Sequence, residues 1–205
     1  MEFHRKFRLH ISSISYCNYV RDRQRLMKDI RSALIFEPYF YDTPTDLFDY
    51  LVANVNWNDT MRARKTAMFG QPNADSEQVH VYNPLLPVMV ELSDRLAPIL
   101  GFKPNNCFLN YYENGNSKMG WHGDSTHFLT EETGTAILSV GDTRIFQIRR
   151  KDVPTELHNY VLLPGSLIYM PASIQEAWQH AIPKVVSERG RISLTFRKMK
   201  TPNTD

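Results

Sequence analysis

After Gly101 the sequence becomes a series of short segments that are rich in β-branched and aromatic residues. Turn residues such as the Gly-Asp of VGDT and the Pro-Gly of LLPGS separate them, which is typical of short β-strands. The segments are NCFLNYYEN, TAILSVG, TRIFQIRR, NYVLLPGSLIYMP and RISLTFRKM. Many short strands in one half of a chain favour a double-sheet jelly roll. We therefore expect an α+β fold with helices first and an antiparallel sheet system after them.

Helices are expected in the first half of the chain. Apolar residues recur at steps of three or four between residues 84 and 100, with Pro84 and Pro87 in the first turn and Gly101 at the end, as in an amphipathic helix. The apolar positions are Leu85, Met89, Leu92, Leu96 and Ile99. A second helix is expected from about Asn18 to Leu34. Residues 56–83 have no clean period, and a long irregular segment in a compact domain is usually a functional loop or lid.

Length and composition are those of an ordinary globular protein, with 205 residues, 42% hydrophobic and 22% charged. We expect one domain over residues 1–205. No apolar run reaches the roughly 18–20 residues of a membrane helix, and MEFHRKFRLH lacks the apolar core of a secretory signal. Two cysteines, Cys17 and Cys107, provide no disulfide framework. These features favour a monomer without a membrane partner, in an intracellular compartment (cytoplasm or nucleus).

Positive charge is concentrated at the N-terminus. Residues 1–31 contain eight Lys or Arg and three Asp or Glu, a net charge of +5, whereas the whole chain has +2. Such a patch could bind a polyanion. A solvated helix face is the alternative interpretation of the same residues.

His122 and Asp124 flank a single glycine and form a candidate pair of metal ligands. On an extended strand both side chains would project from the same face. Two histidines and one carboxylate bind the iron of non-haem Fe(II) oxygenases and leave positions open for oxygen and a co-substrate. The third ligand must come from elsewhere, and the downstream candidates are His127, His158 and His180. His180 lies between the segments SLIYMP and RISLTF, so a strand end could bring it to the same cavity.

The segment RISLTFR predicts a strand with two chemically different faces. Arg191, Ser193 and Arg197 share one face, and the apolar residues Ile192, Leu194 and Phe196 share the other. Two arginines directed inward indicate an anionic ligand, such as the distal carboxylate of a 2-oxoacid. An edge strand with two solvated arginines is the alternative.

Taken together, NYY (110–112), HGD (122–124), His180 and RISLTFR (191–197) resemble the AlkB-like Fe(II)/2-oxoglutarate-dependent dioxygenases. The likeness covers roughly residues 60–200, and ARKTAMFG (63–70) is similar to the start of that family's nucleotide-recognition lid. The resemblance implies a double-stranded β-helix, a jelly roll, over residues 105–200. It also implies an N-terminal helical extension over residues 1–55 that buttresses the core, and a lid over residues 56–83.

The resemblance also implies roles for individual residues. His122, Asp124 and His180 would be the catalytic iron ligands. Arg191 would pair with the distal carboxylate of 2-oxoglutarate and Arg197 would lie near its C1 carboxylate. Further co-substrate contacts are implied for Asn110, Tyr112 and Ser193, the last replacing an asparagine of the family motif. Candidate substrate contacts in the lid are Met68, Phe69, His80 and Tyr82, although Met68 and Phe69 are equally compatible with plain core positions.

The activity implied is oxidative demethylation of alkylated bases in DNA or RNA, as in nucleic-acid repair, with consumption of O₂ and release of formaldehyde, succinate and CO₂. One feature departs from the family. Many members carry an acidic residue one or two positions after the His-x-Asp pair, and it accepts a hydrogen bond from the exocyclic amine of the base. This sequence has Ser125 and Thr126 at these positions. A hydroxyl is a weaker acceptor than a carboxylate. Two alternatives therefore stay open: the same mechanism acting on a small molecule or protein side chain, and a jelly-roll binding module without activity.

Overall fold

The computed structural model describes residues 30–72, 83–187 and 189–201. Most of the helix predicted from Asn18 and nearly all of the basic N-terminal segment lie outside the described residues. The same holds for His80 and Tyr82. What is described of that predicted helix is α2 (Ile30–Ala33), whose Ile30 and Ala33 are buried.

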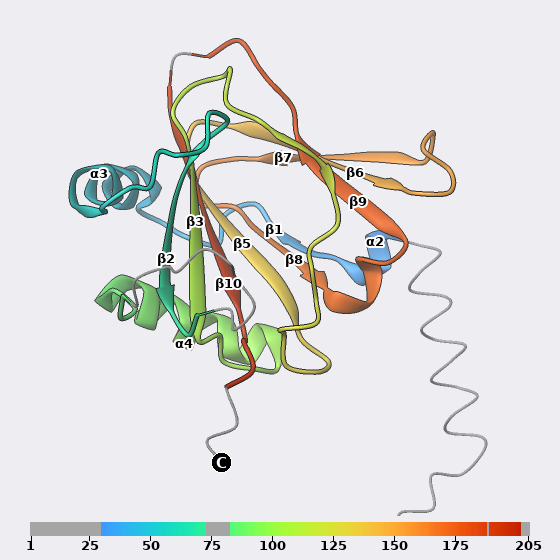
Figure 1. Ribbon diagram of the computed structural model, residues 1–205, viewed down its shortest axis with the longest axis horizontal. Helices are drawn as coiled ribbons and strands as arrows, with labels where there is room; N and C mark the ends of the chain where they lie inside the picture. The colour runs from blue at the N-terminus through green and yellow to red at the C-terminus, as the bar shows by residue number, and fades with distance from the viewer. Residues whose placement is uncertain (1–29, 73–82, 188, 202–205) are drawn as a thin grey trace, which may run out of the picture.

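In the described part of the chain, ten antiparallel strands form two sheets that face each other (Figure 1). The six-stranded sheet has the order β1 (Ile35–Glu37), β8 (Leu167–Pro171), β5 (Gly134–Gly141), β10 (Arg191–Arg197), β3 (Asn106–Tyr112) and β2 (Lys65–Gly70). The four-stranded sheet has the order β4 (Met119–His122), β9 (Trp178–Ile182), β6 (Arg144–Arg150) and β7 (Leu157–Leu162). This is the predicted α+β jelly roll.

The segment NYVLLPGSLIYMP contains two strands that belong to different sheets. β7 pairs with β6 in one sheet, and β8 pairs with β1 and β5 in the other. The chain crosses between the sheets at the Pro-Gly turn, where Gly165 has φ +87°. A Cβ at this position would lie 2.3 Å from the carbonyl oxygen of Tyr41. Glycine is therefore required by both the backbone angle and the close approach.

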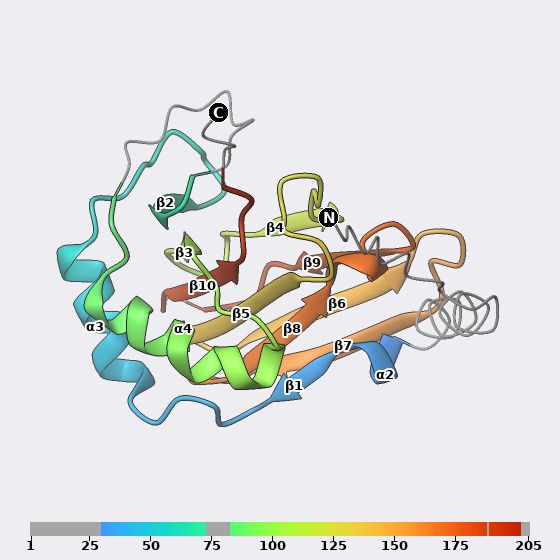
Figure 2. The same ribbon diagram turned by 90° about the horizontal axis from the view of Figure 1, so that it is seen from below.

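Helices α3 (Pro44–Asn54) and α4 (Pro87–Leu100) cover the outer face of the six-stranded sheet, as Figure 2 shows. α4 starts later than predicted: Pro87 occupies its first turn, and Pro84 lies before the helix. Its buried face contains Met89, Leu92, Ser93 and Leu96. Ile99 is 40% exposed, contrary to the prediction, because the buried face continues along the i+4 row to the partly buried Leu100.

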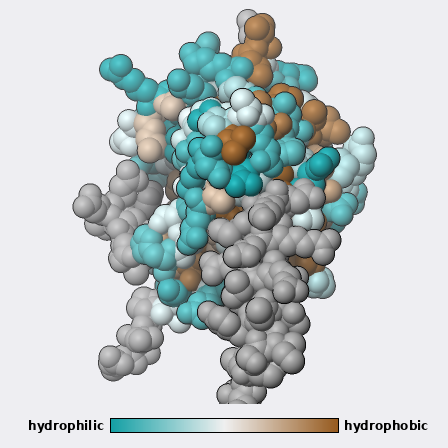
Figure 3. Space-filling view, turned by 90° about the vertical axis from the view of Figure 1, so that its right-hand side faces the viewer, coloured by the Kyte–Doolittle hydropathy of each residue, from teal (hydrophilic) through white to brown (hydrophobic). Residues whose placement is uncertain are grey.

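Two hydrophobic clusters hold the layers together. One lies between the helices and the six-stranded sheet and includes Ile192, Leu194 and Phe196 of β10, which confirms the predicted apolar face of that strand. The other lies between the two sheets and includes Ile137, Phe146 and Trp178. Where Figure 3 shows described residues, hydrophobic groups lie among hydrophilic ones in several separate patches. Among the described helices none is long and apolar enough to cross a membrane.

β2 lies within the segment predicted to be irregular. It pairs with β3 from Lys65 opposite Tyr111 to Gly70 opposite Asn106, so it is a strand of the six-stranded sheet. Its last five residues are all buried, and a strand covered on both faces lacks the polar–apolar alternation that identifies a half-exposed strand. The absence of a period in the sequence was therefore a consequence of burial. That residues 56–83 act as a lid stays a prediction.

Candidate active site

His122 and His180 face each other across a strand pair. His122 ends β4 and His180 lies in the middle of β9, and the two are direct register partners. Their ring centroids are 4.2 Å apart. Residues opposite each other on antiparallel strands project to the same side of the sheet. The pairing of β4 with β9 thus brings together two histidines that are far apart in the sequence.

Asp124 completes the cluster from the irregular segment that follows β4. The sequence predicted that His122 and Asp124 share one strand face, but β4 ends at His122 and Asp124 lies outside it. Its Oδ1 is 3.7 Å from Nε2 of His122 and 3.7 Å from Nε2 of His180. One potential ligand atom from each residue lies within 4.8 Å of the others. Two imidazoles and one carboxylate in this arrangement are the donor set of a non-haem Fe(II) site.

Contacts with Gln175 fix the segment that carries Asp124. The Asp124 N–H donates to Oε1 of Gln175 at 2.8 Å. A Cβ on Gly123 would lie 2.8 Å from the carbonyl oxygen of Gln175, which itself accepts from Nζ of Lys151. A glycine at position 123 therefore lets this segment pack directly against Gln175.

Neighbouring groups also orient the three side chains. Nδ1 of His122 lies 2.9 Å from the Gly120 carbonyl oxygen, so this nitrogen carries the proton and Nε2 keeps its lone pair for a metal. Oγ1 of Thr135 donates to Oδ2 of Asp124 at 2.9 Å. The Phe146 ring stacks on His180 with centroids 5.2 Å apart.

The charge states of the cluster suit a cation. Burial alone would raise the pKa of the Asp124 carboxyl, but Arg197, His180 and the hydrogen bond from Thr135 outweigh burial and hold that pKa below its ordinary value. Burial lowers the pKa of His180 to about 4, against the opposing attraction of Asp124. At neutral pH the cluster is a carboxylate with a neutral His180 imidazole, which are the forms that coordinate a divalent metal. The three residues therefore fit Fe(II).

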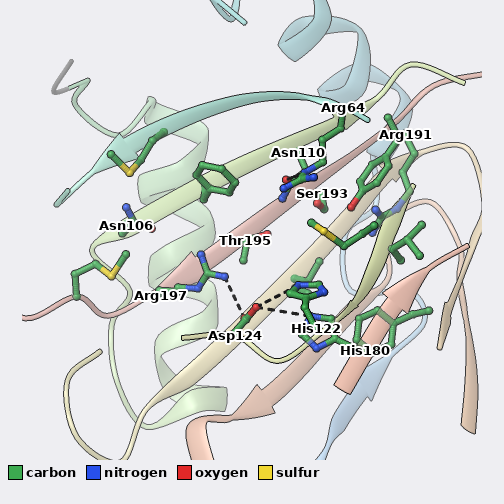
Figure 4. Close-up of a pocket in the computed structure, with 18 of the residues that line it drawn as sticks. Arg64, Asn106, Asn110, His122, Asp124, His180, Arg191, Ser193, Thr195 and Arg197 are labelled. Carbon is green, nitrogen blue, oxygen red and sulfur yellow. Dashed lines mark hydrogen bonds and ion pairs between the residues drawn. The ribbon is translucent and has the colours of Figure 1, made fainter. Parts of the chain in front are cut away.

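The cluster opens into a pocket between the two sheets, shown in Figure 4. Every second residue of β10 and of β3 lines it, which confirms the predicted facing of Arg191, Ser193 and Arg197. The lining positions are Arg191, Ser193, Thr195 and Arg197 of β10 and Asn106, Phe108, Asn110 and Tyr112 of β3. In Figure 4 Arg191 lies at one end and Asn106 at the other, with the His–Asp–His cluster between them.

Arg191 places a buried positive charge at one end of the pocket. It is 1% exposed, its Nε donates to Oγ of Ser139 at 2.7 Å, and its guanidinium lies 5.3 Å from the centroid of the Tyr112 ring. Burial lowers its pKa to about 10, so it is cationic at neutral pH. Within the described residues no carboxylate forms an ion pair with it. A buried cation without a carboxylate partner is suited to a carboxylate ligand.

Two further arginines at this end were missed in the sequence. Nε of Arg64 donates to Oδ1 of Asn110 at 2.6 Å, which leaves the amide nitrogen of Asn110 for another partner. The guanidinium of Arg144 lies 5.4 Å from the Tyr112 centroid and donates to the carbonyls of Ser117 and Pro183. Alternation in TRIFQIRR could have identified Arg144, because it shares the inward face with Phe146.

Other supporting residues carry little signal in the sequence. They are Thr135, Ser139 and Gln175, whose contacts with Asp124 and Arg191 depend on strand order. The remaining histidine candidates lie outside the cluster: His127 bonds to Ser125, and His158 approaches Trp178 with ring centroids 5.9 Å apart.

The structure separates the predicted substrate contacts. Met68 lines the pocket, whereas Phe69, the next residue of β2, belongs to the cluster beneath the helices. Phe69 is therefore a core residue, as strand alternation requires. Ser125 is exposed, its Oγ is 2.7 Å from Nδ1 of His127, and neither Ser125 nor Thr126 lines the pocket.

A family model described as the 2OG-Fe(II) oxygenase superfamily matches residues 45–197. The chain belongs to this superfamily, and within it the chain is AlkB-like. It is 30% identical over 171 residues to the alpha-ketoglutarate-dependent dioxygenase alkB homolog 3 of Rattus norvegicus, covering 74% of this chain and 58% of that protein. It is 23% identical over 189 residues to the DNA oxidative demethylase ALKBH2 of Arabidopsis thaliana, covering 73% and 60%.

A solved structure of OsALKBH1 matches with a TM-score of 0.62 and 13% identity, covering 81% of this chain and 98% of that one. At this identity the match concerns the fold, and it supports the jelly-roll assignment. The chain spans roughly three fifths of the length of the curated relatives named above, 58% and 60%.

Proposed function

We propose that this chain is an Fe(II)- and 2-oxoglutarate-dependent oxygenase that removes alkyl groups from nucleobases of DNA or RNA. The observation that carries the proposal is the arrangement of one pocket. A His–Asp–His cluster lies in its middle, and the buried Arg191, which has no carboxylate partner among the described residues, lies at one end. A metal-bound 2-oxoacid needs both features within one molecule's length.

His122, Asp124 and His180 would hold Fe(II) and leave the remaining coordination positions to the co-substrate and O₂. Bound iron supplies the O₂-dependent oxidation itself. The protein contributes the fixed geometry: Asp124 is held by Thr135 and Arg197 and the His122 tautomer is set by Gly120.

The residues at the Arg191 end would bind 2-oxoglutarate. Arg191 would pair with the distal carboxylate, and the amide nitrogen of Asn110, whose oxygen is already engaged by Arg64, would donate to the same molecule. Tyr112 and Ser193 line this end and have hydroxyls to add. Burial between two sheets excludes water from the reacting centre.

The opposite end of the pocket would take the base. Met68, Phe108, Phe128 and Met199 line it and give an apolar surface for a flat ring. A base within a duplex cannot enter such a pocket, so it must be single-stranded or flipped out. Oxidation of an N-methyl group gives a hydroxymethyl product that is lost as formaldehyde, while 2-oxoglutarate becomes succinate and CO₂. The description of the Arabidopsis relative as a DNA oxidative demethylase supports this assignment.

The test uses the full chain with Fe(II), 2-oxoglutarate, O₂ and oligonucleotides that carry single methylated bases. We expect succinate and formaldehyde in equal amounts and a mass decrease of one CH₂ group in the oligonucleotide, because hydrogen replaces the methyl group. D124A should abolish turnover while the far-ultraviolet circular dichroism stays unchanged. If no methylated oligonucleotide in DNA or RNA form is demethylated, the nucleic-acid proposal is wrong.

A second candidate function is the same oxidation on a small molecule or a protein side chain. It is favoured by Ser125, which is exposed and stands where the AlkB-like pattern has an acid for the base. Succinate formation that is stimulated by such a substrate, and not by any methylated oligonucleotide, would favour this candidate.

A further inference from the structure

The end of the pocket opposite Arg191 contains one polar side chain of a special kind. Asn106 is the register partner of Arg197 across β3 and β10, and both line the pocket. Arg197 in turn contacts Asp124 of the metal cluster at 3.1 Å. Asn106 is therefore separated from the His–Asp–His cluster by one residue, Arg197. Its other neighbours in this part of the lining are apolar: Met68, Phe108, Phe128 and Met199.

The orientation of the Asn106 amide is determined by the two hydrogen bonds that its nitrogen donates. The side chain is 0% exposed, and Nδ2 donates to the carbonyl oxygens of Phe69, at 3.4 Å, and Gln71, at 2.8 Å. An amide nitrogen has two hydrogens, and both are used here. The flipped alternative would place Oδ1 against these two carbonyl oxygens and is excluded. Oδ1 consequently points away from the Phe69 and Gln71 carbonyls.

Oδ1 of Asn106 has no hydrogen-bond partner within the described part of the chain. The other buried side-chain atoms in this condition belong to Trp57, Ser93, Arg144 and Ser166, and none of these residues lines the pocket. A buried acceptor that lacks a partner is unfavourable. In a ligand site it selects a ligand that brings a donor. Asn106 combines burial, a fixed orientation and a place in the pocket lining.

We propose that Asn106 is a specificity-determining residue whose Oδ1 accepts an N–H of the substrate base. The donor is the exocyclic amine adjacent to the alkylated ring nitrogen. This inference rests on the proposed function and names which bases the site accepts: those with an amine at that position, rather than a carbonyl. In the AlkB-like pattern an acid after Asp124 accepts this hydrogen bond. Here Ser125 is exposed and bonds to His127, so Asn106 of β3 would accept it instead.

The experiment compares two substrates that differ only in this group. Oligonucleotides of one sequence carry either 3-methylcytosine, with an amine beside the methylated nitrogen, or 3-methyluracil, with a carbonyl there. The readout is the ratio of kcat/KM for the two bases, so general damage to an enzyme variant cancels. For the unaltered chain we expect a preference for 3-methylcytosine of roughly 10- to 100-fold, the effect of one hydrogen bond to a buried acceptor.

Asn106→Leu should reduce this ratio toward one by lowering the rate on 3-methylcytosine. The KM for 2-oxoglutarate should stay unchanged, because the Arg191 end of the pocket is untouched. Asn106→Ala also removes the acceptor, without adding volume, and should reduce the ratio in the same way. Asn159→Leu, the same replacement at an exposed position of β7, should leave the ratio at the value of the unaltered chain.

The outcomes separate the two proposals. If both bases are demethylated with similar efficiency by the unaltered chain, or if N106L keeps the full preference, the role of Asn106 is overturned while the demethylase function stands. If the unaltered chain demethylates neither base nor any other methylated base, the proposed function is overturned and this inference with it. Should N106L fail to fold, the ratio measured for N106A decides the question.

Discussion

Arg197 donates from Nη2 to Oδ2 of Asp124 at 3.1 Å, while the other carboxylate oxygen faces the two histidines. The two oxygens of Asp124 therefore have separate tasks. Oδ2 is held by Arg197 and Thr135, and Oδ1 is directed at the place where a metal would lie. A guanidinium suits this position because its Nε also reaches Oγ1 of Thr135, at 3.3 Å.

Arg197→Lys should weaken metal binding even though the charge is retained. A lysine has one nitrogen and cannot bond to Asp124 and Thr135 in the same planar geometry. Loss of a residue that orients a metal ligand typically reduces affinity by about 10- to 100-fold. Titration of the purified protein with Mn(II), followed by electron paramagnetic resonance, measures the affinity directly. Arg189→Lys, an exposed exchange of the same kind, is the control; an unchanged affinity in R197K would contradict this account of Asp124.

Arg191→Lys should raise the KM for 2-oxoglutarate and leave Mn(II) affinity unchanged. Arg191 is buried and already bonded to Ser139, so it presents a fixed fork to a carboxylate, whereas lysine presents a single flexible ammonium. We expect an increase of roughly 10- to 100-fold. Initial rates of succinate formation over a range of 2-oxoglutarate concentrations give the KM. Equal loss of metal affinity and co-substrate binding would instead indicate a general collapse of the pocket.

Alternation was enough to predict the co-substrate side of the site. RISLTFR alternates strictly between pocket and core, and the neighbouring strand β3 does the same. His180 could be proposed only by combining this strand with the His-x-Asp pair, because the register that places it opposite His122 is a property of the folded sheet. Asp124 was expected on one strand with His122, but β4 ends at His122 and Asp124 lies in the irregular segment after it, where its N–H donates to Gln175.

The substrate side could not be predicted to the same depth. β2 is buried on both faces, so the sequence alone could not show that Met68 faces the pocket and Phe69 the core. Asn106 begins the predicted strand NCFLNYYEN, but nothing in that segment shows which groups its side chain meets. Its role depends on which carbonyls its amide meets, and these belong to a segment 35 and 37 residues away in the chain.

His180 should make the stability of the metal-free protein depend on pH. Burial lowers the pKa of His180 to about 4 in the folded chain, against an ordinary value of 6.5. Between these values the unfolded chain binds the proton and the folded chain does not, so the free energy of unfolding falls as the pH is lowered from about 6.5 to about 4. Asp124 does not contribute in this window, because its carboxyl has an ordinary pKa of 3.8 and a lower one when folded.

Denaturant unfolding at several pH values, with a chelator present, measures this dependence. His180→Gln should flatten the slope between pH 6.5 and 4, while His158→Gln, a histidine outside the metal cluster, should retain it. A slope in H180Q equal to that of the unaltered chain would show that the acid sensitivity has another origin.

Gly120 and Gly123, on either side of His122, offer a matched test of whether close packing against Gln175 positions Asp124. A Cβ at Gly120 would meet nothing within 4 Å, whereas one at Gly123 would lie 2.8 Å from the backbone oxygen of Gln175. That oxygen cannot move freely, since it accepts from Lys151 and the Gln175 side chain holds the Asp124 N–H. Gly123→Ala must therefore displace the segment that follows β4 and move Asp124 away from the two histidines. We expect Mn(II) affinity to fall by about tenfold or more in G123A and to stay at its original value in G120A, with both proteins folded by circular dichroism. Equal affinities in the two variants would mean that this segment can shift without moving the Asp124 carboxylate. The close packing of Gly123 against Gln175 would then have no part in positioning that ligand.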